Sequence, residues 1–364
     1  MLLVCLIPRT KRWLLPRCSS RWQRVSERSV DLSIVLAVDL GRTGCRATLW
    51  NDEGEQPLAS ANGEGTVGLT AAKGPEVAEQ AILAVVAPLL TRLGVLAIDR
   101  SCIGAPGALV APERARQLAQ KLVASIPSRT VAVTSDAITS HAGALAGAPG
   151  VVLAAGTGAI VVAIGAAGQF QRVDGWGPWL GDEGSGAWLG RAGLRAAARA
   201  YDGRGPATRL QAAAQAQFGA VETLAVQLSA DSNPARTVAT FAPAVAEAAR
   251  QGDDVARQLL RDAAMALADS IIAGAAILNQ ASLIPVVILG GLTNMGVVLL
   301  DPLLEALDRS EARLRVCPAK GTSSDGARWL ATHDDGIHER WMVRVDQAVA
   351  RLGDSFAISE GGHA

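Results

Sequence analysis

The sequence predicts an α/β protein made of two similar halves that face each other across a cleft. Short apolar runs rich in β-branched residues alternate with amphipathic stretches of helical period, a pattern typical of sheets flanked by helices. A unit of strand, Gly/Thr turn and second strand occurs twice, first from residue 33 and again from residue 151. The 364 residues are 49% hydrophobic and 19% charged, which is sufficient for two cores of ordinary size.

The first half is expected over residues 32–148. It opens with a strand at 33–38 that is apolar enough to be buried on both faces. Its further elements are expected as a return strand at 45–50, a loop or edge strand at 58–70, a helix at 75–93, a strand at 95–98, a loop at 101–107, a helix at 112–124, a strand at 130–134 and a helix from Asp136. This order favours a mixed sheet covered by helices.

The second half is expected over residues 149–335, after the Pro149-Gly150 break. Its elements are expected as strands at 151–155, 159–164 and 168–173, a helix at 185–201, an Ala-rich helical region at 205–280, a strand at 285–289, a helix at 294–307, a strand at 313–317 and a helix at 325–333. Residues 336–364 are expected to form a last amphipathic helix, at 337–352, and a loose tail. Ligands of open α/β sheets collect at strand ends, so two such halves predict a binding site between them.

Residues 1–31 form a basic extension that is excluded from the fold. Its composition fits an organellar presequence or, better, translation from an upstream start codon. The five cysteines contain no C-x-x-C pair, which argues against a disulfide framework and against a zinc or iron–sulfur site. Formal net charge is zero and no 18-residue apolar run occurs, so neither nucleic acid nor a membrane is an expected partner. A reduced, cytoplasmic protein is expected.

The most unusual stretch runs from Asp174 to Gly186 and combines five glycines with two tryptophans and three carboxylates. Regular helices and strands do not tolerate this density of glycine, so the stretch is expected to be a loop lining a cleft. Its indole faces can pack on a ligand, while Asp182 and Glu183 offer acceptors for hydroxyl groups. A structural turn before a helix, with the acids near the positive end of the helix dipole, is the alternative interpretation.

Two turns at matching positions of the halves are candidates for phosphate binding. In the first, Asp39-Leu40-Gly41-Arg42-Thr43, backbone amides and the Thr43 hydroxyl can form a nest, and Asp39 can hold Mg²⁺ through water. The second is Gly156-Thr157-Gly158. Each alone is equally compatible with an ordinary β-hairpin. Gly290-Gly291 follows a buried strand and would let a flat ligand such as adenine approach the backbone, or would simply turn the chain into a helix.

Asp136 follows the strand at 130–134 and is predicted to lie at the N-cap of the next helix. There it either stabilises the helix as a cap, by about 1 kcal/mol, or serves as the base that accepts a proton from a substrate hydroxyl. His141, further along the same helix, is expected on a helix face, since no second His or Cys is spaced to share a metal with it.

These pieces together resemble the sugar kinase/Hsp70/actin superfamily and, within it, the N-acetylglucosamine kinase-like, BadF/BadG/BcrA/BcrD-type ATPases. The most specific resemblance lies in Gly175-Trp176-Gly177, residues 180–185 and Trp188-Leu189-Gly190, which are similar to that family's G-W-G…G-D-E-G-S…W-I-G signature. The resemblance covers roughly residues 33–335. It implies two ribonuclease H-like, or actin-like ATPase, domains with an interdomain cleft.

The resemblance also implies roles for single residues. Asp136 would be the catalytic base and would also contact the substrate, and Gly175, Trp176, Gly177 and Asp182 would contact the sugar. The turn residues would bind ATP together with Mg²⁺, and Gly290-Gly291 would form the adenosine motif. One departure stands out: the family's first motif commonly reads D-G-G-G-T, and here Leu40 and Arg42 replace two glycines. Arg42 either adds a cation over the phosphates or restricts the turn. A homodimer is a further implication.

Three functions follow as hypotheses. The first is an ATP-dependent kinase that phosphorylates a hydroxyl, preferably O6, of an amino sugar such as N-acetylglucosamine or glucosamine. The second is an ATPase that activates a partner enzyme; relatives of that kind hold an iron–sulfur cluster with cysteines, which the cysteine positions here do not resemble. The third is a non-catalytic sensor of a sugar or nucleotide, which only Arg42 favours. The kinase is the preferred interpretation, and the sequence does not select among amino sugars.

Overall fold

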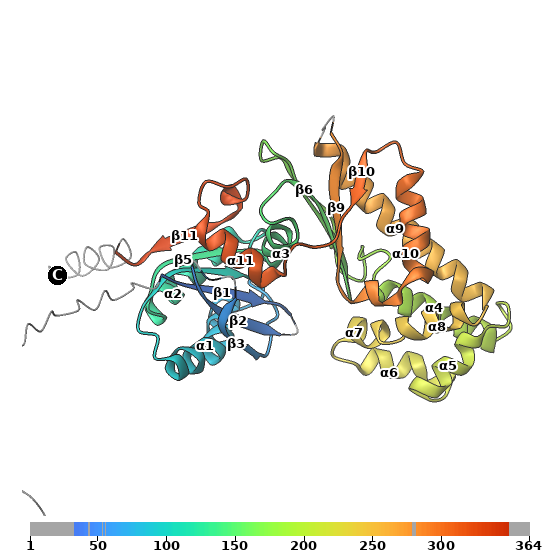
Figure 1. Ribbon diagram of the computed structural model, residues 1–364. Helices are drawn as coiled ribbons and strands as arrows, with labels where there is room; N and C mark the ends of the chain where they lie inside the picture. Colours follow the sequence, from blue (N-terminus) through green and yellow to red (C-terminus); the bar gives the residue numbers. More distant parts are fainter. Residues whose placement is uncertain (1–32, 43, 53, 55, 279–281, 349–364) are drawn as a thin grey trace, which may run out of the picture. The chain divides into compact units, whose positions relative to one another are not determined.

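The protein is described by a computed structural model that covers residues 33–42, 44–52, 54, 56–278 and 282–348. The described residues, from Ser33 to Ala348, form one compact unit. The basic extension at 1–31, the expected tail from 353, and Thr43 of the first turn lie outside the described residues. Figure 1 shows the arrangement of the helices and strands.

The first sheet is mixed, as predicted. Its strand order is β11-β5-β4-β1-β2-β3, with bounds Val343–Asp346, Ser128–Thr134, Ile98–Gly104, Ile34–Leu40, Cys45–Asn51 and Pro57–Gly63. β1, β4 and β5 are parallel to one another, while β2, β3 and β11 join by antiparallel pairing. The parallel strands therefore end at one shared edge, where ligands of α/β proteins bind.

The second sheet repeats this plan. Its strand order is β10-β9-β6-β7-β8, with bounds Leu314–Val316, Ile284–Leu289, Gly150–Ala155, Ala159–Ile164 and Phe170–Asp174. β6, β7 and β8 form an antiparallel meander, and β9 and β10 continue from β6 in parallel. The order matches β5-β4-β1-β2-β3 of the first sheet, so the internal repeat predicted from the two Gly/Thr turns is present.

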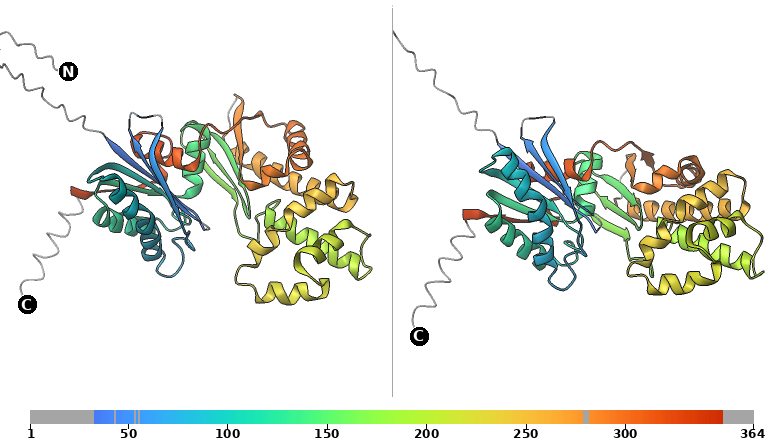
Figure 2. Two further views of the ribbon diagram at one scale, coloured as in Figure 1. Left: turned by 60° about the horizontal axis from the view of Figure 1, so that its bottom comes forward. Right: turned by 90° about the horizontal axis from the view of Figure 1, so that it is seen from below.

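Helices cover the outer face of each sheet. In the first half they are α1 (Gly74–Leu93) and α2 (Pro112–Ser125), which share a buried core with β1, β2, β4 and β5. In the second half, α9 (Asp254–Leu278) packs against β6, β7 and β8. Near it gather α4 (Gly186–Tyr201) and the other helices of the Ala-rich region (Figure 2), with bounds α5 Arg209–Phe218, η1 Val221–Thr223, α6 Leu224–Ala230, α7 Pro234–Ala239 and α8 Ala242–Arg250.

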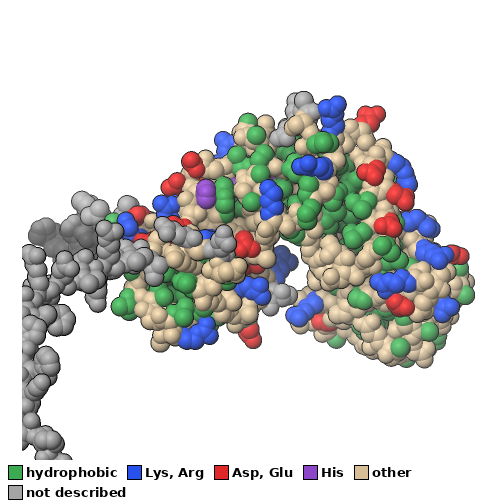
Figure 3. All heavy atoms as spheres, viewed as in Figure 1, with side chains coloured by type: hydrophobic (Ala, Val, Ile, Leu, Met, Phe, Trp, Pro, Cys, Tyr) green, Lys and Arg blue, Asp and Glu red, His purple; other side chains and the backbone are tan. Residues whose placement is uncertain are grey.

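Apart from α3, which is described below, the remaining helices come after β9 and β10 in the chain. Their bounds are η2 Gly291–Met295, α10 Val297–Asp308, α11 Ser323–Thr332 and η3 Glu339–Trp341. Among the described residues, no helix is both long and apolar enough to cross a membrane. On the face shown in Figure 3, basic and acidic side chains are interspersed, in keeping with the balanced composition.

Helices α3 (Asp136–Leu145) and α11 pack directly on each other. Their backbones approach closely at two glycines: a Cβ on Gly143 would collide with the carbonyl oxygen of Thr322, and one on Gly326 would collide with that of Thr139. α11 also contacts β1 and β4. The predicted division had placed this helix in the 149–335 half, whereas its packing joins it to the first sheet.

Two sequence predictions of secondary structure are wrong. The last helix was expected at 337–352, but residues 339–346 form η3 and then strand β11, because Val343, Arg344, Val345 and Asp346 alternate with the period of a strand and pair with β5. Residues 349–352 lie outside the described residues. The strand expected at 95–98 begins at Ile98 and runs to Gly104, through most of the expected loop. Its parallel pairing with β1 and β5 explains the difference, since neither partner is adjacent in sequence.

Candidate functional site

Asp39 and Asp136 both lie at the carboxyl edge of the parallel strands of the first sheet. Asp39 is near the end of β1 and is in register with Gly104 of β4, which in turn is in register with Thr134 of β5. Asp136 comes two residues after Thr134 and is the first residue of α3. The sheet therefore brings together two carboxylates separated by almost a hundred residues of chain.

Asp136 is not the helix cap that the sequence predicted. Ser135 is the N-cap, and its Oγ accepts a hydrogen bond from the Ala137 amide at 3.2 Å. The Oδ1 atom of Asp136 accepts from Ser135 Oγ at 2.9 Å and from the Ala137 amide at 3.0 Å. Among the described residues, none donates to Oδ2. One carboxylate oxygen is thus fixed and the other is available to a ligand.

The electrostatic setting of Asp136 keeps its proton affinity high. Burial raises the pKa of this carboxyl above its usual value, and the nearby Asp39 carboxylate raises it further, while the hydrogen bonds from Ser135 and Ala137 and the charge of Arg42 act in the opposite direction. A carboxylate with a raised pKa is a better proton acceptor than an exposed one. Its setting therefore suits a base for a hydroxyl group.

Asp39 opens the first candidate phosphate turn. Its Oδ2 accepts a hydrogen bond from Ser323 Oγ at the start of α11, and the turn closes with the Gly41 amide donating to the Gly44 carbonyl at 2.8 Å. The Thr66 amide donates to the Gly41 carbonyl at 3.0 Å. Neither Ser323 nor Thr66 was predicted from the sequence, because each contact joins segments far apart in the chain.

Gly65 makes the approach of that neighbouring loop possible. A Cβ at Gly65 would collide with the Gly41 carbonyl oxygen and would lie 2.5 Å from the Gly44 nitrogen. Gly65 and Thr66, within the segment expected as a loop or edge strand at 58–70, thus pack against the turn.

The family resemblance implies Mg²⁺, and the residues present fit it. Asp39 and Asp136 are close enough for the charge of one to raise the pKa of the other. A dication is the natural partner of two such carboxylates, and Mg²⁺ prefers oxygen ligands with part of its water shell retained. Asp39, with one oxygen bonded to Ser323, would hold the ion mainly through its other oxygen and through water.

The second candidate turn, Gly156-Thr157-Gly158, joins β6 to β7. The Gly156 amide donates to the Gly158 carbonyl at 2.8 Å. The carboxylate of Asp182 lies against Gly158, where a Cβ would come within 2.8 Å of Oδ2. Only glycine fits this position without displacing Asp182. The turn and the glycine-rich loop, which comprises residues 174–186, are therefore in direct contact.

Gly290 and Gly291 lie beside the same turn. Gly290 has φ of +103°, and a Cβ there would collide with the carbonyl oxygen of Ala155, the residue before Gly156. Gly291 begins η2, and nothing lies within 4 Å of where its Cβ would be. The predicted adenosine motif and second phosphate turn are thus neighbours, with open space over Gly291.

Asp174 organises the glycine-rich loop. Its Oδ1 accepts from the Asp182 amide at 2.7 Å and from the Trp176 amide at 3.4 Å, and its Oδ2 accepts from the Glu183 amide at 2.7 Å. Gly181 packs so closely on this carboxylate that a Cβ would collide with it. The sequence singled out the loop but not this role, because Asp174 and Asp182 meet only through unusual backbone angles, φ of +59° and +54°.

Three large apolar residues of the loop are exposed. The side chains of Trp176, Trp179 and Leu180 are 65%, 82% and 84% exposed. The Arg172 guanidinium lies 4.4 Å from the centre of the Trp176 ring, which fixes the indole in place. Gly175 and Gly177 both have positive φ and flank this indole.

Asp182 is only partly buried, yet burial raises the pKa of its carboxyl, and Asp174 raises it further. The backbone amides of Ala159 and Gly177 and the charge of Arg42 lower it. Arg42 thus lies close enough to affect both Asp136 and Asp182. The guanidinium that replaces a glycine of the family motif therefore contributes positive charge to both candidate carboxylates.

Comparisons with known proteins concern the fold and the family. The structure is similar to that of a protein of Chromobacterium violaceum provisionally named N-acetylglucosamine kinase, with 29% sequence identity and a TM-score of 0.65, over 83% of this chain and 99% of the other. A protein of the same provisional name from Porphyromonas gingivalis matches at 17% identity and a TM-score of 0.62, over 85% and 99% of the chains, and bears on the fold alone. No curated protein matches the chain.

The predicted fold of two ribonuclease H-like domains is confirmed by the two sheets and these neighbours. The family model described as the BadF/BadG/BcrA/BcrD ATPase family matches residues 36–313, most of the chain. The predicted family is thus confirmed over residues 36–313, the stretch that contains the two turns and the glycine-rich loop. The protein belongs to the BadF/BadG/BcrA/BcrD ATPase family.

Proposed function

We propose that the protein is an ATP-dependent sugar kinase that transfers the γ-phosphoryl group to a hydroxyl of an amino sugar, such as O6 of N-acetylglucosamine or glucosamine. The observation that carries the proposal is Asp136, whose Oδ2 accepts no hydrogen bond from the described residues and whose pKa is raised by burial. Family membership supports the use of ATP, and the similarity to the Chromobacterium violaceum protein supports a sugar as acceptor.

In this proposal Asp136 accepts the proton of the attacking hydroxyl, and Ser135 and Ala137 hold its carboxylate in place. The amides of the two turns other than those of Gly41 and Gly156, which bond within the turns, bind the phosphates, and Arg42 adds a cation near them. Mg²⁺, held by Asp39, would neutralise charge on the phosphates when bound. Phosphoryl transfer depends mainly on such positioning and electrostatic stabilisation.

The sugar is proposed to bind on the glycine-rich loop. The exposed faces of Trp176 and Trp179 offer flat apolar surfaces for a pyranose ring, and Asp182 and the loop amides offer partners for its hydroxyl and amide groups. Sugar sites commonly combine apolar faces with a few fixed polar groups. Gly175 and Gly177 leave room for the ring to approach the backbone.

The alternative, an ATPase that activates a partner enzyme through a cysteine-bound cluster, has weaker support. Cys45 and Cys102 are buried in the first sheet, and burial raises the pKa of each thiol to about 12. Metal clusters bind thiolates, so neutral thiols packed in a core are poor ligands. Cys317 is the remaining cysteine of the described residues.

The test is Asp136→Asn in a coupled ADP-release assay with a panel of amino sugars. The wild-type protein should release ADP with at least one of them. The variant should lose at least about 100-fold in kcat, the usual contribution of a general base, and should bind ATP nearly as well as wild type. Asp308→Asn, at an exposed position of α10, is the matched control. Wild-type turnover in Asp136→Asn would remove Asp136 from this role.

A further inference from the structure

A segment near the C-terminus reaches back to the strand and helix that carry Asp136. It comprises residues 338–346, which we call the C-terminal strap, and it lies beyond residue 313, where the family model ends. β11 of the strap pairs with β5 in the register Val343↔Val133 to Asp346↔Thr130. Without β11, the strand that leads into Asp136 would be the edge of its sheet. Edge strands are less firmly held than inner ones.

The strap holds the end of β5 by a buried hydrogen bond. The Oγ1 of Thr134 donates to the carbonyl of Trp341 at 2.7 Å, and the Thr134 side chain is only 1% exposed. The backbone carbonyl of Thr134 accepts a hydrogen bond from the amide of Ala105, the residue after β4, at 2.8 Å. Thr134 is thus tied to the strap on one side and to β4 on the other, two residues before Asp136.

The strap also holds α3 through two histidines. His141 Nδ1 lies 3.0 Å from His338 Nε2, and His141 Nε2 lies 3.0 Å from the Gly150 carbonyl. A carbonyl only accepts, so His141 carries its proton on Nε2 and accepts on Nδ1 from the Nε2 proton of His338. Both rings are fully buried. His141 was expected on a helix face; the structure gives it a specific partner in the strap.

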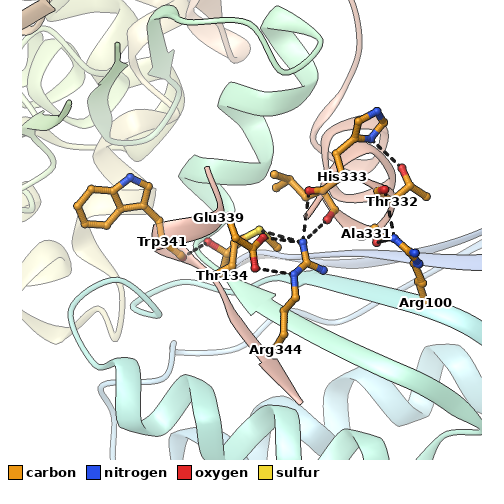
Figure 4. A network of polar contacts seen from close by, with 10 residues as sticks. Arg100, Thr134, Ala331, Thr332, His333, Glu339, Trp341 and Arg344 are labelled. Carbon is orange, nitrogen blue, oxygen red and sulfur yellow. Dashed lines mark hydrogen bonds and ion pairs between the residues drawn. The ribbon is translucent and has the colours of Figure 1, made fainter. Parts of the chain in front are cut away.

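An ion pair fixes the strap itself, as Figure 4 shows. The guanidinium of Arg344 donates to both carboxylate oxygens of Glu339, at 2.7 and 2.8 Å. It also donates to the carbonyl of Leu330 at 2.7 Å. Bidentate pairs of this kind are directional as well as strong. The turn of chain between Glu339 and Arg344, which contains Trp341, is therefore held in one conformation.

The strap reaches the second sheet as well. Arg340 donates to the carbonyl of Gly168, in the turn between β7 and β8, at 3.0 Å. The rings of Trp341 and Phe170, the first residue of β8, have centroids 4.4 Å apart. One short segment thus contacts β5, α3 and the hairpin that leads into the glycine-rich loop.

From these contacts we propose that the C-terminal strap is a positioning element for Asp136, acting through the Thr134 hydroxyl and the His338–His141 pair. The catalytic part of this inference rests on the proposed kinase function. The structural part does not, because it concerns how firmly the first turn of α3 is held. Thr134 and His141 are positioning residues here and need not touch a substrate.

The test compares Thr134→Val, which removes the hydroxyl at nearly constant shape, with Thr134→Ser, which retains it. Amide hydrogen exchange is measured over residues 135–139, and kcat and KM are measured with ATP and the best amino sugar. In Thr134→Val, exchange should quicken about tenfold, as expected for one lost buried hydrogen bond. Its kcat should fall at least about tenfold, since small misplacements of a catalytic group are costly, with KM for ATP unchanged. Thr134→Ser should resemble wild type.

Ser101→Ala is the matched control, because Ser101 is equally buried in β4 but bonds Ser128 at 2.8 Å and not the strap. It should leave exchange at 135–139 unchanged. The proposal is overturned if the Val and Ser variants exchange alike, or if Ser101→Ala quickens exchange as much as Thr134→Val. A wild-type protein that phosphorylates no amino sugar would defeat the proposed function, while the exchange comparison would still decide whether the strap holds α3.

Discussion

Two aspartates of the candidate site use their carboxylates in opposite ways. Asp174 binds backbone amides with both oxygens and so serves the shape of the glycine-rich loop. Asp136 has one oxygen bonded by its neighbours and the other without a donor among the described residues. Asp174 ends strand β8 and Asp136 follows strand β5, and their roles differ because the loop after Asp174 curls back to present the amides of Asp182 and Glu183 to its carboxylate.

Replacing Asp174 by Ala should therefore damage sugar binding more than ATP binding. The amides of Asp182 and Glu183 would lose their acceptor, and the loop that carries Trp176 would loosen. Steady-state kinetics should show KM for the sugar rising about tenfold, the typical effect of one or two lost charge-assisted hydrogen bonds, with KM for ATP nearly unchanged. Glu183→Gln, which alters an exposed side chain in the same loop, should leave both constants close to wild type.

At the scale of elements, the crossing of α3 and α11 depends on two glycines that permit backbone contact. Gly143→Ala would drive a methyl group into the carbonyl of Thr322, on a helix that also contacts β1 and β4. Overpacking of this kind costs about 1–3 kcal/mol. Since both partners at the contact are backbone, we expect the upper part of that range.

Urea denaturation should show this loss as a lower midpoint at unchanged slope. Gly291→Ala is the control, because no atom lies within 4 Å of its added methyl group, so its free energy of unfolding should change little. An equal loss in both variants would show that the crossing does not determine the effect, since a change from Gly to Ala by itself raises helix propensity and lowers the entropy of the unfolded chain.

Local patterns predicted most of the elements, and the failures share a cause. The strands at 34–40 and 150–155 are apolar except for Asp39, so their burial was readable, and their turns marked the repeat. β11 was predicted as helix because its partner β5 lies two hundred residues earlier in the chain. In the site, Asp39, Asp136 and Asp182 were proposed from their places in a turn, after a strand and in the glycine-rich loop, and the family resemblance supplied their roles. Ser323 beside Asp39 and the amides that bind Asp174 depend on tertiary contact alone.

For the whole molecule, the buried histidine pair predicts how stability changes with pH. Burial lowers the pKa of His141 to about 4, and burial with the neighbouring His141 lowers the pKa of His338 to about 3. Both are neutral in the folded protein, whereas in the unfolded chain each binds a proton below about pH 6.5. Their contribution to stability is therefore complete above that pH and is lost as pH falls toward 4.

The free energy of unfolding should decrease between pH 6.5 and 4 by up to about 1.4 kcal/mol per pH unit for each histidine. Denaturation at several pH values measures this slope in wild type and in His338→Gln, whose amide can still donate to His141. In the variant, the decrease in the free energy of unfolding that the two histidines cause between pH 6.5 and 4 should be about half as large. His333→Gln, at an exposed ring stacked on Trp329, should keep the wild-type slope; the same slope in all three proteins would contradict the assignment.

The contact between Gly158 and Asp182 has a consequence for how two ligands bind. The Gly186 amide donates to the Gly156 carbonyl at 2.8 Å and the Ala187 amide to the Thr157 carbonyl at 3.0 Å, so the phosphate turn and the glycine-rich loop share one hydrogen-bond network. A ligand that orders one of them lowers the entropy that the other must lose. Nucleotide and sugar would then each raise the affinity of the other by the same factor, as thermodynamic linkage requires.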